Sequence, residues 1–319
     1  MAGGDILGVL AIERAIVQAP VGGCATPALV AAVGEAGGLG TLACTWTPPE
    51  LLAPLLARVR TLTAKPFAAN LVLWFEVDDQ LEALLALAVP VVTFSWGRPG
   101  RDRIARCHAA GARVAVQVGT AAGARAARED GADALIAQGV EAGGHVQSTT
   151  PLGDLLADVL EAAGGTPVVA AGGLATHADV TRVRARGAAG AMLGTRFLAT
   201  AESGAHDVYK AALVAAGAGS TALTVCFDGE WPHASHRVLR NVTLERWEDA
   251  GCPAPGRRPG EGDPPATRGG VPIARYDDRE PLAGDEGAIE EMCLYAGEGC
   301  DAIEDVPAVA ALLDRLDPR

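Results

Sequence analysis

The chain has 319 residues, with 26 basic and 39 acidic side chains and a formal net charge of −13 at pH 7. Such a charge repels phosphate backbones, and no Lys/Arg cluster with interleaved aromatic residues offsets it, so nucleic acid is excluded as a partner. The sequence has no uninterrupted apolar stretch of about 18 residues and no basic leader, which predicts a cytoplasmic protein without a membrane span.

Short β-branched runs alternate with Ala/Leu-rich amphipathic stretches in the first two thirds of the chain. The predicted strands are residues 16–20, 39–44, 67–73, 91–97, 113–119, 134–139, 167–173 and 190–197. Their starts lie 21 to 33 residues apart, which leaves room for a helix and two short loops each time. Thr26 and Pro27 supply an N-cap and a first-position proline for the first of these helices.

Eight such units predict an α/β fold of the (β/α)8 TIM barrel type. A doubly wound sheet is disfavoured, because no Gly-x-Gly-x-x-Gly motif follows the first strand. The composition changes after a predicted helix near 203–217, and Pro and Gly become dense. We therefore expect a barrel of residues 1–217, a small irregular α+β cap of residues 218–285, and a helical segment of residues 286–319 that packs back on the barrel.

In a parallel barrel the reactive groups lie where the strands end, at the carboxyl face. Residues 138–145 follow the sixth predicted strand and carry an amide, a carboxylate and an imidazole between glycines. Gly172 and Gly173 follow the seventh strand, and Gly194 and Thr195 follow the eighth. Each pair alone is equally consistent with a plain strand-to-helix turn. Together, at adjacent strand ends, they predict a phosphate site made of backbone N–H groups.

His145 is the candidate catalytic residue, because it alone among six histidines follows a double glycine at a predicted strand end. The other histidines lie in predicted helices or in the late segment and are expected to be surface or structural residues: His108, His177, His206, His233 and His236. Glu141 is expected to stabilise its own loop. The seven cysteines are scattered without a Cys-x-x-Cys pair, so neither a metal site nor a disulfide framework is predicted.

Three motifs at these strand ends, residues 138–145, 169–173 and 192–198, resemble the nitronate monooxygenase (2-nitropropane dioxygenase-like) family of FMN-dependent barrels. Further matching segments are residues 19–23, 35–40, 70–71 and 294–299. The resemblance therefore runs through most of the chain. Its motifs are specific to the superfamily and not to one activity.

The resemblance implies that FMN lies across the carboxyl face of the barrel. The phosphate would contact Gly172, Gly173, Gly194 and Thr195. The flavin ring and polyol chain would meet Val21, Gly22, Gly23 and Asn70, and the same rim would be lined by Gln117, Gln138, Gly143 and Gly144. The implied reaction oxidises alkyl nitronates, propionate 3-nitronate among them, with O2 to a carbonyl compound and nitrite.

His145 matches the family's catalytic histidine, which takes the carbon-bound proton of a nitroalkane or stabilises the nitronate anion beside the flavin. An imidazole with an ordinary pKa of about 6.5 is largely neutral at pH 7 and is available for this work. The chain departs from the pattern of many relatives at three positions, where glycine, glutamine and methionine are replaced by Gln147, Glu298 and Val21, respectively.

Other functions stay open beside this one. On the same FMN barrel they are an NAD(P)H:quinone reductase and, ranked below it, an enoyl-acyl-carrier-protein reductase, which tends to carry serine in place of Ala142. We find no basic patch for an acidic carrier protein. A different class is a non-catalytic flavin-binding protein. The implied partners are a small-molecule nitronate and O2, and the sequence leaves open whether the chain forms a homo-oligomer.

Overall fold

The chain is described by a computed structural model that covers residues 5–229 and 231–318. Within these residues, eight parallel strands form one sheet in the order β1-β9-β8-β6-β5-β4-β3-β2. Their bounds are β1 Ile16–Gln18, β2 Gly40–Ala43, β3 Phe67–Val72, β4 Val91–Ser95, β5 Arg113–Val118, β6 Ala134–Gln138, β8 Val168–Ala171 and β9 Gly190–Leu193. A parallel bridge between Val17 and Leu39 brings β1 beside β2 and nearly closes the ring. The predicted TIM barrel is confirmed.

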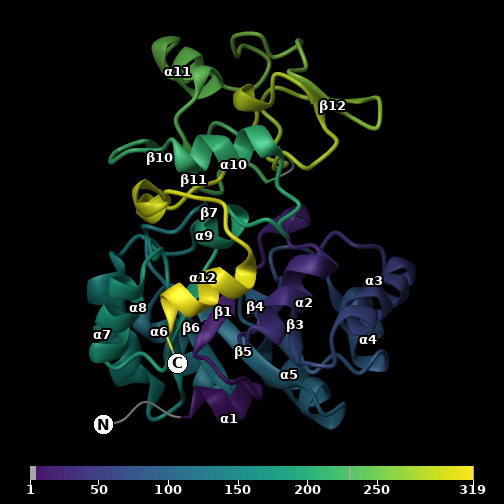
Figure 1. The fold of residues 1–319 in the computed structure, drawn as a ribbon, viewed down its shortest axis with the longest axis vertical. Coiled ribbons are helices and arrows are strands. Elements are labelled where there is room, and N and C mark those ends of the chain that lie inside the picture. Colours follow the sequence, from purple (N-terminus) through teal and green to yellow (C-terminus); the bar gives the residue numbers. More distant parts are fainter. Residues whose placement is uncertain (1–4, 230, 319) are drawn as a thin grey trace.

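Helices surround this barrel in Figure 1. Their bounds are α2 Pro27–Glu35, α3 Pro49–Leu62, α4 Asp78–Ala86, α5 Gly100–Ala109, α6 Ala121–Asp130, α7 Leu152–Ala163 and α8 His177–Ala185. Thr26 caps α2 as predicted, because its hydroxyl accepts a hydrogen bond of 3.0 Å from the backbone N–H of Leu29. None of the helices in the described part of the chain has the length and apolarity that a membrane crossing requires.

The last barrel strand is shorter than the predicted 190–197. It ends at Leu193, and the next residues form the short helix α9, Thr195–Leu198. The apolar side chain of Phe197 is buried, which is why the predicted strand extended to this residue although it belongs to a helical turn. Gly194 and Thr195 therefore lie at a strand-to-helix junction rather than inside a strand.

Side chains alternate between two apolar layers along each barrel strand, as the strand pleat requires. In β8, Val168 and Ala170 pack in the layer shared with the helices, and Val169 and Ala171 pack in a second layer inside the barrel. The inner layer also contains residues of α1, Ile6–Leu10, which closes one end of the barrel. At the opposite end, where the strands terminate, the barrel is bordered by the connecting loops.

A small α+β cap covers that carboxyl end and forms the upper part of Figure 1. One antiparallel sheet joins β10 Thr221–Thr224, β11 His236–Leu239 and β7 Gly144–His145. A second joins β12 Ala266–Arg268, β13 Val271–Ile273 and β14 Glu286–Gly287, and the helices of this region are α10 Asp207–Val214 and α11 Val242–Asp249. Since β7 comes from the loop after β6, the cap is hydrogen-bonded to the barrel itself.

The apolar periodicity of residues 286–319 predicted a helical segment, but the tail is helical only in part. Ile289–Glu291 and Glu298–Ala302 form 3-10 turns, and only α12, Val309–Leu316, is an α-helix. The physical reason is that Gly297 passes too close to the loop after β6 for any side chain, so the segment runs extended beside that loop. Helix α12 then packs against α2 and α8.

We predict that Leu313→Ala destabilises the protein. Leu313 has no exposed surface and lies in the main core cluster, and removing such a side chain leaves a cavity that costs about 2–5 kcal/mol. Urea denaturation measures the change in the free energy of unfolding. The matched control is Leu51→Ala, because Leu51 is 52% exposed in α3 and should cost little. Equal losses in the two variants would contradict the contribution assigned to α12.

Candidate functional site

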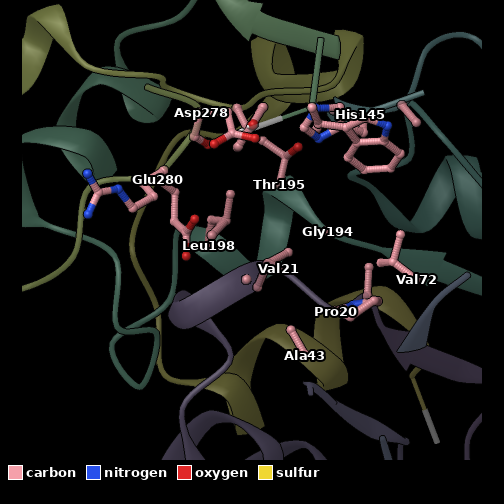
Figure 2. A pocket seen from close by; sticks show the side chains of 18 of the residues that line it. Pro20, Val21, Ala43, Val72, His145, Gly194, Thr195, Leu198, Asp278 and Glu280 are labelled. Carbon is pink, nitrogen blue, oxygen red and sulfur yellow. Dashed lines mark hydrogen bonds between the residues drawn. The ribbon is translucent and has the colours of Figure 1, made fainter. Parts of the chain in front are cut away.

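A cavity of about 1140 Å³ lies between the carboxyl ends of the barrel strands and the cap. Figure 2 shows part of its lining, with His145 and Thr195 on one side and Pro20 and Val21 on another. All thirteen site residues singled out in the sequence line it: Val21, Gly22, Gly23, Asn70, Gln117, Gln138, Gly143, Gly144, His145, Gly172, Gly173, Gly194 and Thr195. The fold thus brings together residues that are far apart in the sequence.

Gly172 and Gly173 expose bare backbone to this cavity just after β8. Both have left-handed backbone conformations, with φ of 110° and 66°. A Cβ atom on Gly172 would lie 3.1 Å from the carbonyl oxygen of Gly139, and one on Gly173 would lie 2.9 Å from the Cβ of Glu141. Conformation and close packing both require glycine here, so the N–H groups of this turn stay accessible to a ligand.

The end of β9 completes this side of the cavity. Gly194 and Thr195 also line it, and the Thr195 hydroxyl accepts a hydrogen bond of 2.9 Å from the backbone N–H of Gly297. The C-terminal tail is thereby fixed beside the predicted phosphate site. Together with Gly172 and Gly173, this arrangement offers a concave, glycine-lined end suited to an anionic group.

The loop after β6 is held by the cap and the tail. The buried guanidinium of Arg237, in β11, donates to the carbonyl of Val140 at 3.0 Å and pairs with Glu298 at 3.0 Å. Glu141 has the structural role expected for it, because both of its carboxylate oxygens accept from the backbone N–H of Leu152 at the start of α7. Glu298, a departure from the family pattern, therefore anchors the loop that leads to His145.

His145 lies on β7 opposite His236 of β11. Its ring stacks on Trp231, with centroids 4.4 Å apart and planes inclined by 25°. Tyr295 lies 5.7 Å away. Burial, and to a smaller extent the neighbouring His236, lower the pKa of His145 to about 3, so the ring is neutral at pH 7. Its Nε2 atom is buried and has no hydrogen-bond partner among the described residues, which marks it as a group that a ligand would satisfy.

His236 was expected to be a surface or structural residue, and it is structural. It is fully buried, its Nδ1 contacts the carbonyl of Ala234 at 3.0 Å, and its Nε2 accepts from the N–H of Phe227 at 3.3 Å. These bonds fix the tautomer with the proton on Nδ1. Burial lowers the pKa of His236 to about 4. Its place beside His145 had no signal in the sequence, since 91 positions separate the two residues.

Gln147 replaces the glycine of many relatives, and its side chain connects two barrel strands. Its Oε1 atom accepts from the backbone N–H of Trp96, after β4, and from the amide of Gln117, in β5, both at 3.2 Å. Its own N–H donates to Gln138 at 2.9 Å. Trp96 has a φ of 55°, which is a strained conformation for a bulky residue. Gln147 therefore helps to hold Trp96 against the cavity.

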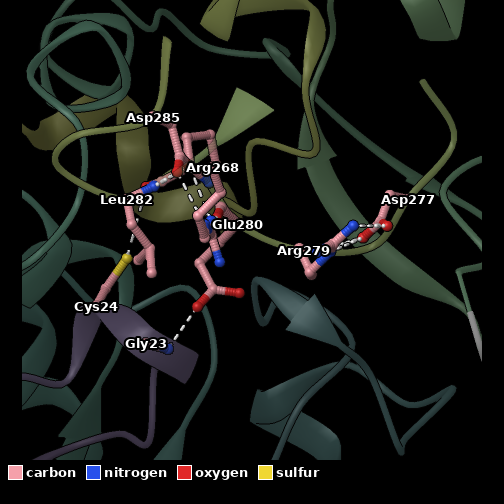
Figure 3. A network of polar contacts seen from close by, with 9 residues as sticks. Gly23, Cys24, Arg268, Asp277, Arg279, Glu280, Leu282 and Asp285 are labelled. Carbon is pink, nitrogen blue, oxygen red and sulfur yellow. Dashed lines mark hydrogen bonds and ion pairs between the residues drawn. The ribbon is translucent and has the colours of Figure 1, made fainter. Parts of the chain in front are cut away.

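The cap contributes carboxylates and arginines that sequence reasoning missed. Figure 3 shows Glu280 reaching the backbone N–H of Gly23, with Arg268 and Asp285 paired beside it. Burial raises the pKa of the Glu280 carboxyl. Arg268 binds Asp285 through two bonds of 2.8 Å and also donates to the carbonyl of Glu280. The Pro- and Gly-rich composition of residues 218–285 predicted an irregular cap, but it did not indicate which of these residues line the cavity.

Metal binding has no support in the described residues, where no group of three or more His, Cys, Asp or Glu side chains could hold an ion. The chemistry available in the cavity is that of a neutral imidazole, several amides, the carboxylates and arginines of the cap, and glycine backbone suited to an anion. Such a set of residues binds and orients a ligand or cofactor.

We predict that the two buried histidines make the protein sensitive to acid. Their folded pKa values, about 3 and about 4, lie below the ordinary 6.5, so the unfolded chain binds protons that the folded chain does not. The contribution of the two neutral histidines to the free energy of unfolding should be fully present above about pH 6.5. Below that pH the free energy of unfolding should fall by up to about 1.4 kcal/mol per pH unit for each histidine.

His236→Asn should reduce the slope of unfolding free energy between about pH 6 and pH 5 by up to that amount. Urea titrations at several pH values measure it. At about pH 8 both proteins lack the proton, so the difference there reports lost packing alone and serves as the internal control. A slope unchanged by the substitution would refute the assignment.

Comparison with known proteins agrees with this geometry. The model of the family described as "Nitronate monooxygenase" matches residues 5–76 and 74–318. A dehydrogenase of a hydroxy-methyl-oxo-octahydro-indene-carboxyl-CoA from Mycobacterium tuberculosis is 38% identical over 75% of this chain and 67% of its own. A nitronate monooxygenase from Pseudomonas aeruginosa is 32% identical over 95% of each chain.

Two solved structures are similar over nearly the whole chain. The nitroalkane oxidase of Streptomyces ansochromogenes is 33% identical, with a TM-score of 0.80 over 98% of this chain and 96% of that one. FabK from Thermotoga maritima is 28% identical, with a TM-score of 0.84 over 99% and 95%. Since the family model spans almost all of the sequence, this chain belongs to the nitronate monooxygenase family of oxidoreductases.

Proposed function

We propose that this protein is an FMN-dependent nitronate monooxygenase that oxidises alkyl nitronates with O2 to a carbonyl compound and nitrite. The observation that carries the proposal is the cavity itself. It joins the glycines at the ends of β8 and β9, the predicted anion site, to the neutral ring of His145, whose buried Nε2 has no hydrogen-bond partner among the described residues. Propionate 3-nitronate is one substrate of the proposed class.

The residues present fit FMN. The phosphate would be held by the backbone of Gly172, Gly173, Gly194 and Thr195, whose N–H groups bind an anion without adding net charge. The ring would lie beside Gly22 and Gly23, which line the cavity next to the Glu280 carboxylate. Amide groups of Asn70, Gln117 and Gln138 line the same cavity and supply donors and acceptors for the polar edges of the cofactor. Bound FMN would supply the electron transfer from the nitronate and the subsequent reaction with O2.

His145 acts on the substrate as a neutral group. A ring with a pKa of about 3 is a weak base, which favours stabilisation of a nitronate that is already an anion over removal of a proton from carbon. The N–H of a neutral imidazole can donate a hydrogen bond to a nitronate oxygen. The stacked indole of Trp231 excludes water from one face of the imidazole and strengthens that bond.

A second candidate is a dehydrogenase or reductase of a thioester, with the same cofactor. It is supported by the 38% identity to the indene-carboxyl-CoA dehydrogenase of Mycobacterium tuberculosis and by the likeness to FabK. An NAD(P)H:quinone reductase belongs to the same group of alternatives. These functions differ from the proposed one in the molecule that delivers electrons to the flavin.

We predict that an alkyl nitronate, added without O2, bleaches the flavin absorbance of the FMN-loaded protein. Addition of NADH or NADPH under the same conditions is the comparison. Reduction by the nitronate alone supports the monooxygenase, and reduction only by the nicotinamide supports a reductase. A colourless protein that cannot be reconstituted with FMN would overturn both functions.

We predict that His145→Ala retains FMN but loses nitronate oxidation by about a hundredfold or more, as expected when a group that acts in the transition state is removed. Flavin absorbance after gel filtration reports cofactor retention, and O2 uptake reports turnover. The control is His233→Ala, an exposed residue of the same region. Unchanged turnover in His145→Ala would overturn the catalytic role of His145, whereas absence of turnover in the parent protein would favour a non-catalytic flavin-binding protein.

We predict that Gly194→Asp weakens FMN binding at least about tenfold relative to Gly194→Asn, because a carboxylate at the phosphate end repels the phosphate. The two side chains have nearly the same shape, so their difference isolates charge. The backbone of Gly194 has a φ of −108°, and a Cβ there would make ordinary contacts of 3.5 Å with Ala19 and Val21, so both variants should fold. Equal FMN dissociation constants would place the phosphate elsewhere.

A further inference from the structure

Aromatic residues are scarce in this chain and are concentrated at the cavity. The sequence has five tryptophans, five phenylalanines and three tyrosines. Three of the tryptophans and one phenylalanine line the cavity beside His145: Trp46, Trp96, Trp231 and Phe75. We call these four residues the aromatic wall. A fourth tryptophan, Trp74, stacks on Trp231 from behind, with ring centroids 6.2 Å apart.

The aromatic wall is continuous from His145 to the surface. The ring of His145 stacks on Trp231 at 4.4 Å, Trp231 contacts Phe75 at 5.3 Å, and Phe75 contacts Trp46 at 5.4 Å. Trp96 packs on Trp231 from the side at 4.6 Å. These spacings are those of paired aromatic rings. The wall is therefore an ordered surface that leads outward from the imidazole.

The wall occupies the side of the barrel opposite the anion site. Trp46, Phe75 and Trp96 follow β2, β3 and β4, respectively. In the sheet order, β6 and β5 separate β8 from β4, and β1 and β2 separate β9 from β3. A cofactor whose phosphate lies at β8 and β9 would therefore extend toward the wall without covering all of it.

The outer end of the wall is exposed although it is apolar. Trp46 is 58% exposed and Trp74 is 64% exposed, whereas Trp231 is only 3% exposed. Grouped exposed aromatic surface at a cavity is typical of a binding site. The strained backbone of Trp96, held by Gln147, is a second sign that these rings are positioned for a ligand.

The cavity also has more space than one small ligand needs. Its volume is about 1140 Å³, whereas a pocket for one drug-sized ligand measures about 300–1,000 Å³. The volume therefore leaves room for a substrate beside FMN, and Phe75 and Trp46 line this cavity.

We propose that the aromatic wall is a substrate subsite for a rigid, apolar ring body attached to the reacting carbon. This inference deepens the proposed function and rests on it for the reacting group at His145. Flat rings stack on the wall's indole and phenyl faces. A flexible alkyl chain of the same size loses more conformational entropy when it is held, so the wall selects rings over chains.

The test uses the FMN-loaded protein and two carboxylates with equal carbon number, naphthylacetate and dodecanoate, whose carboxylate stands in for the nitronate. Calorimetry measures binding without turnover. Naphthylacetate should bind about tenfold more tightly than dodecanoate, and Trp46→Ala should weaken its binding by roughly five- to tenfold, the size of an aromatic contact. Since Trp46 is mostly exposed, the variant should fold.

The matched control is Trp247→Phe, because Trp247 lies in α11 and bonds to the carbonyl of Pro253, outside the wall. It should bind both ligands as the parent does. A change of less than about twofold in Trp46→Ala, or equal affinity for the two carboxylates, overturns the subsite.

Oxidation of ethyl nitronate, measured separately, distinguishes this proposal from the proposed function. If the protein binds naphthylacetate through Trp46 but does not oxidise the nitronate, the subsite is supported and the proposed function is overturned. If the protein oxidises the nitronate but binds naphthylacetate independently of Trp46, only the proposed subsite is overturned.

Discussion

The candidate site depends on the close fit of three backbone segments: the loop after β6, cap strand β11 and the tail around Gly297. A side chain on Gly143 or Gly297 would collide with the other segment, so these glycines set how closely the segments approach. Arg237 joins all three through Val140 and Glu298. His145 lies on β7, the short strand of that loop that pairs with β11. The position of the imidazole is therefore a property of the assembled barrel, cap and tail.

Burial by the cap also determines the electrostatics of the imidazole. Trp231 and Tyr295 come from outside the barrel sequence, and together with His236 they surround His145. Water is excluded, so the charged form is disfavoured and the pKa falls to about 3. An exposed histidine at the same strand end would be partly protonated near neutral pH. The cap thus converts an ordinary loop histidine into a neutral hydrogen-bonding group, which suits the anionic substrate that we propose.

The two sides of the cavity have different chemistry because they are built from different strand ends. The turns after β8 and β9 carry Gly172, Gly173 and Gly194, which present backbone N–H groups. The turns after β2, β3 and β4 carry bulky rings instead. We propose that the first side holds the cofactor phosphate and that the second side distinguishes the substrate of this chain.

The sequence by itself determined the eight barrel strands and the residues at their ends, because hydrophobic periodicity and glycine turns are local signals. Its prediction of a strand through residue 197 and a helix from residue 286 was wrong in detail, since apolar side chains are buried in turns and extended segments as well. Only the tertiary structure placed Trp231 and Glu280 at the cavity and His236 beside His145. Their positions follow from long-range pairing of the cap with the barrel, which leaves no periodic pattern in an irregular segment.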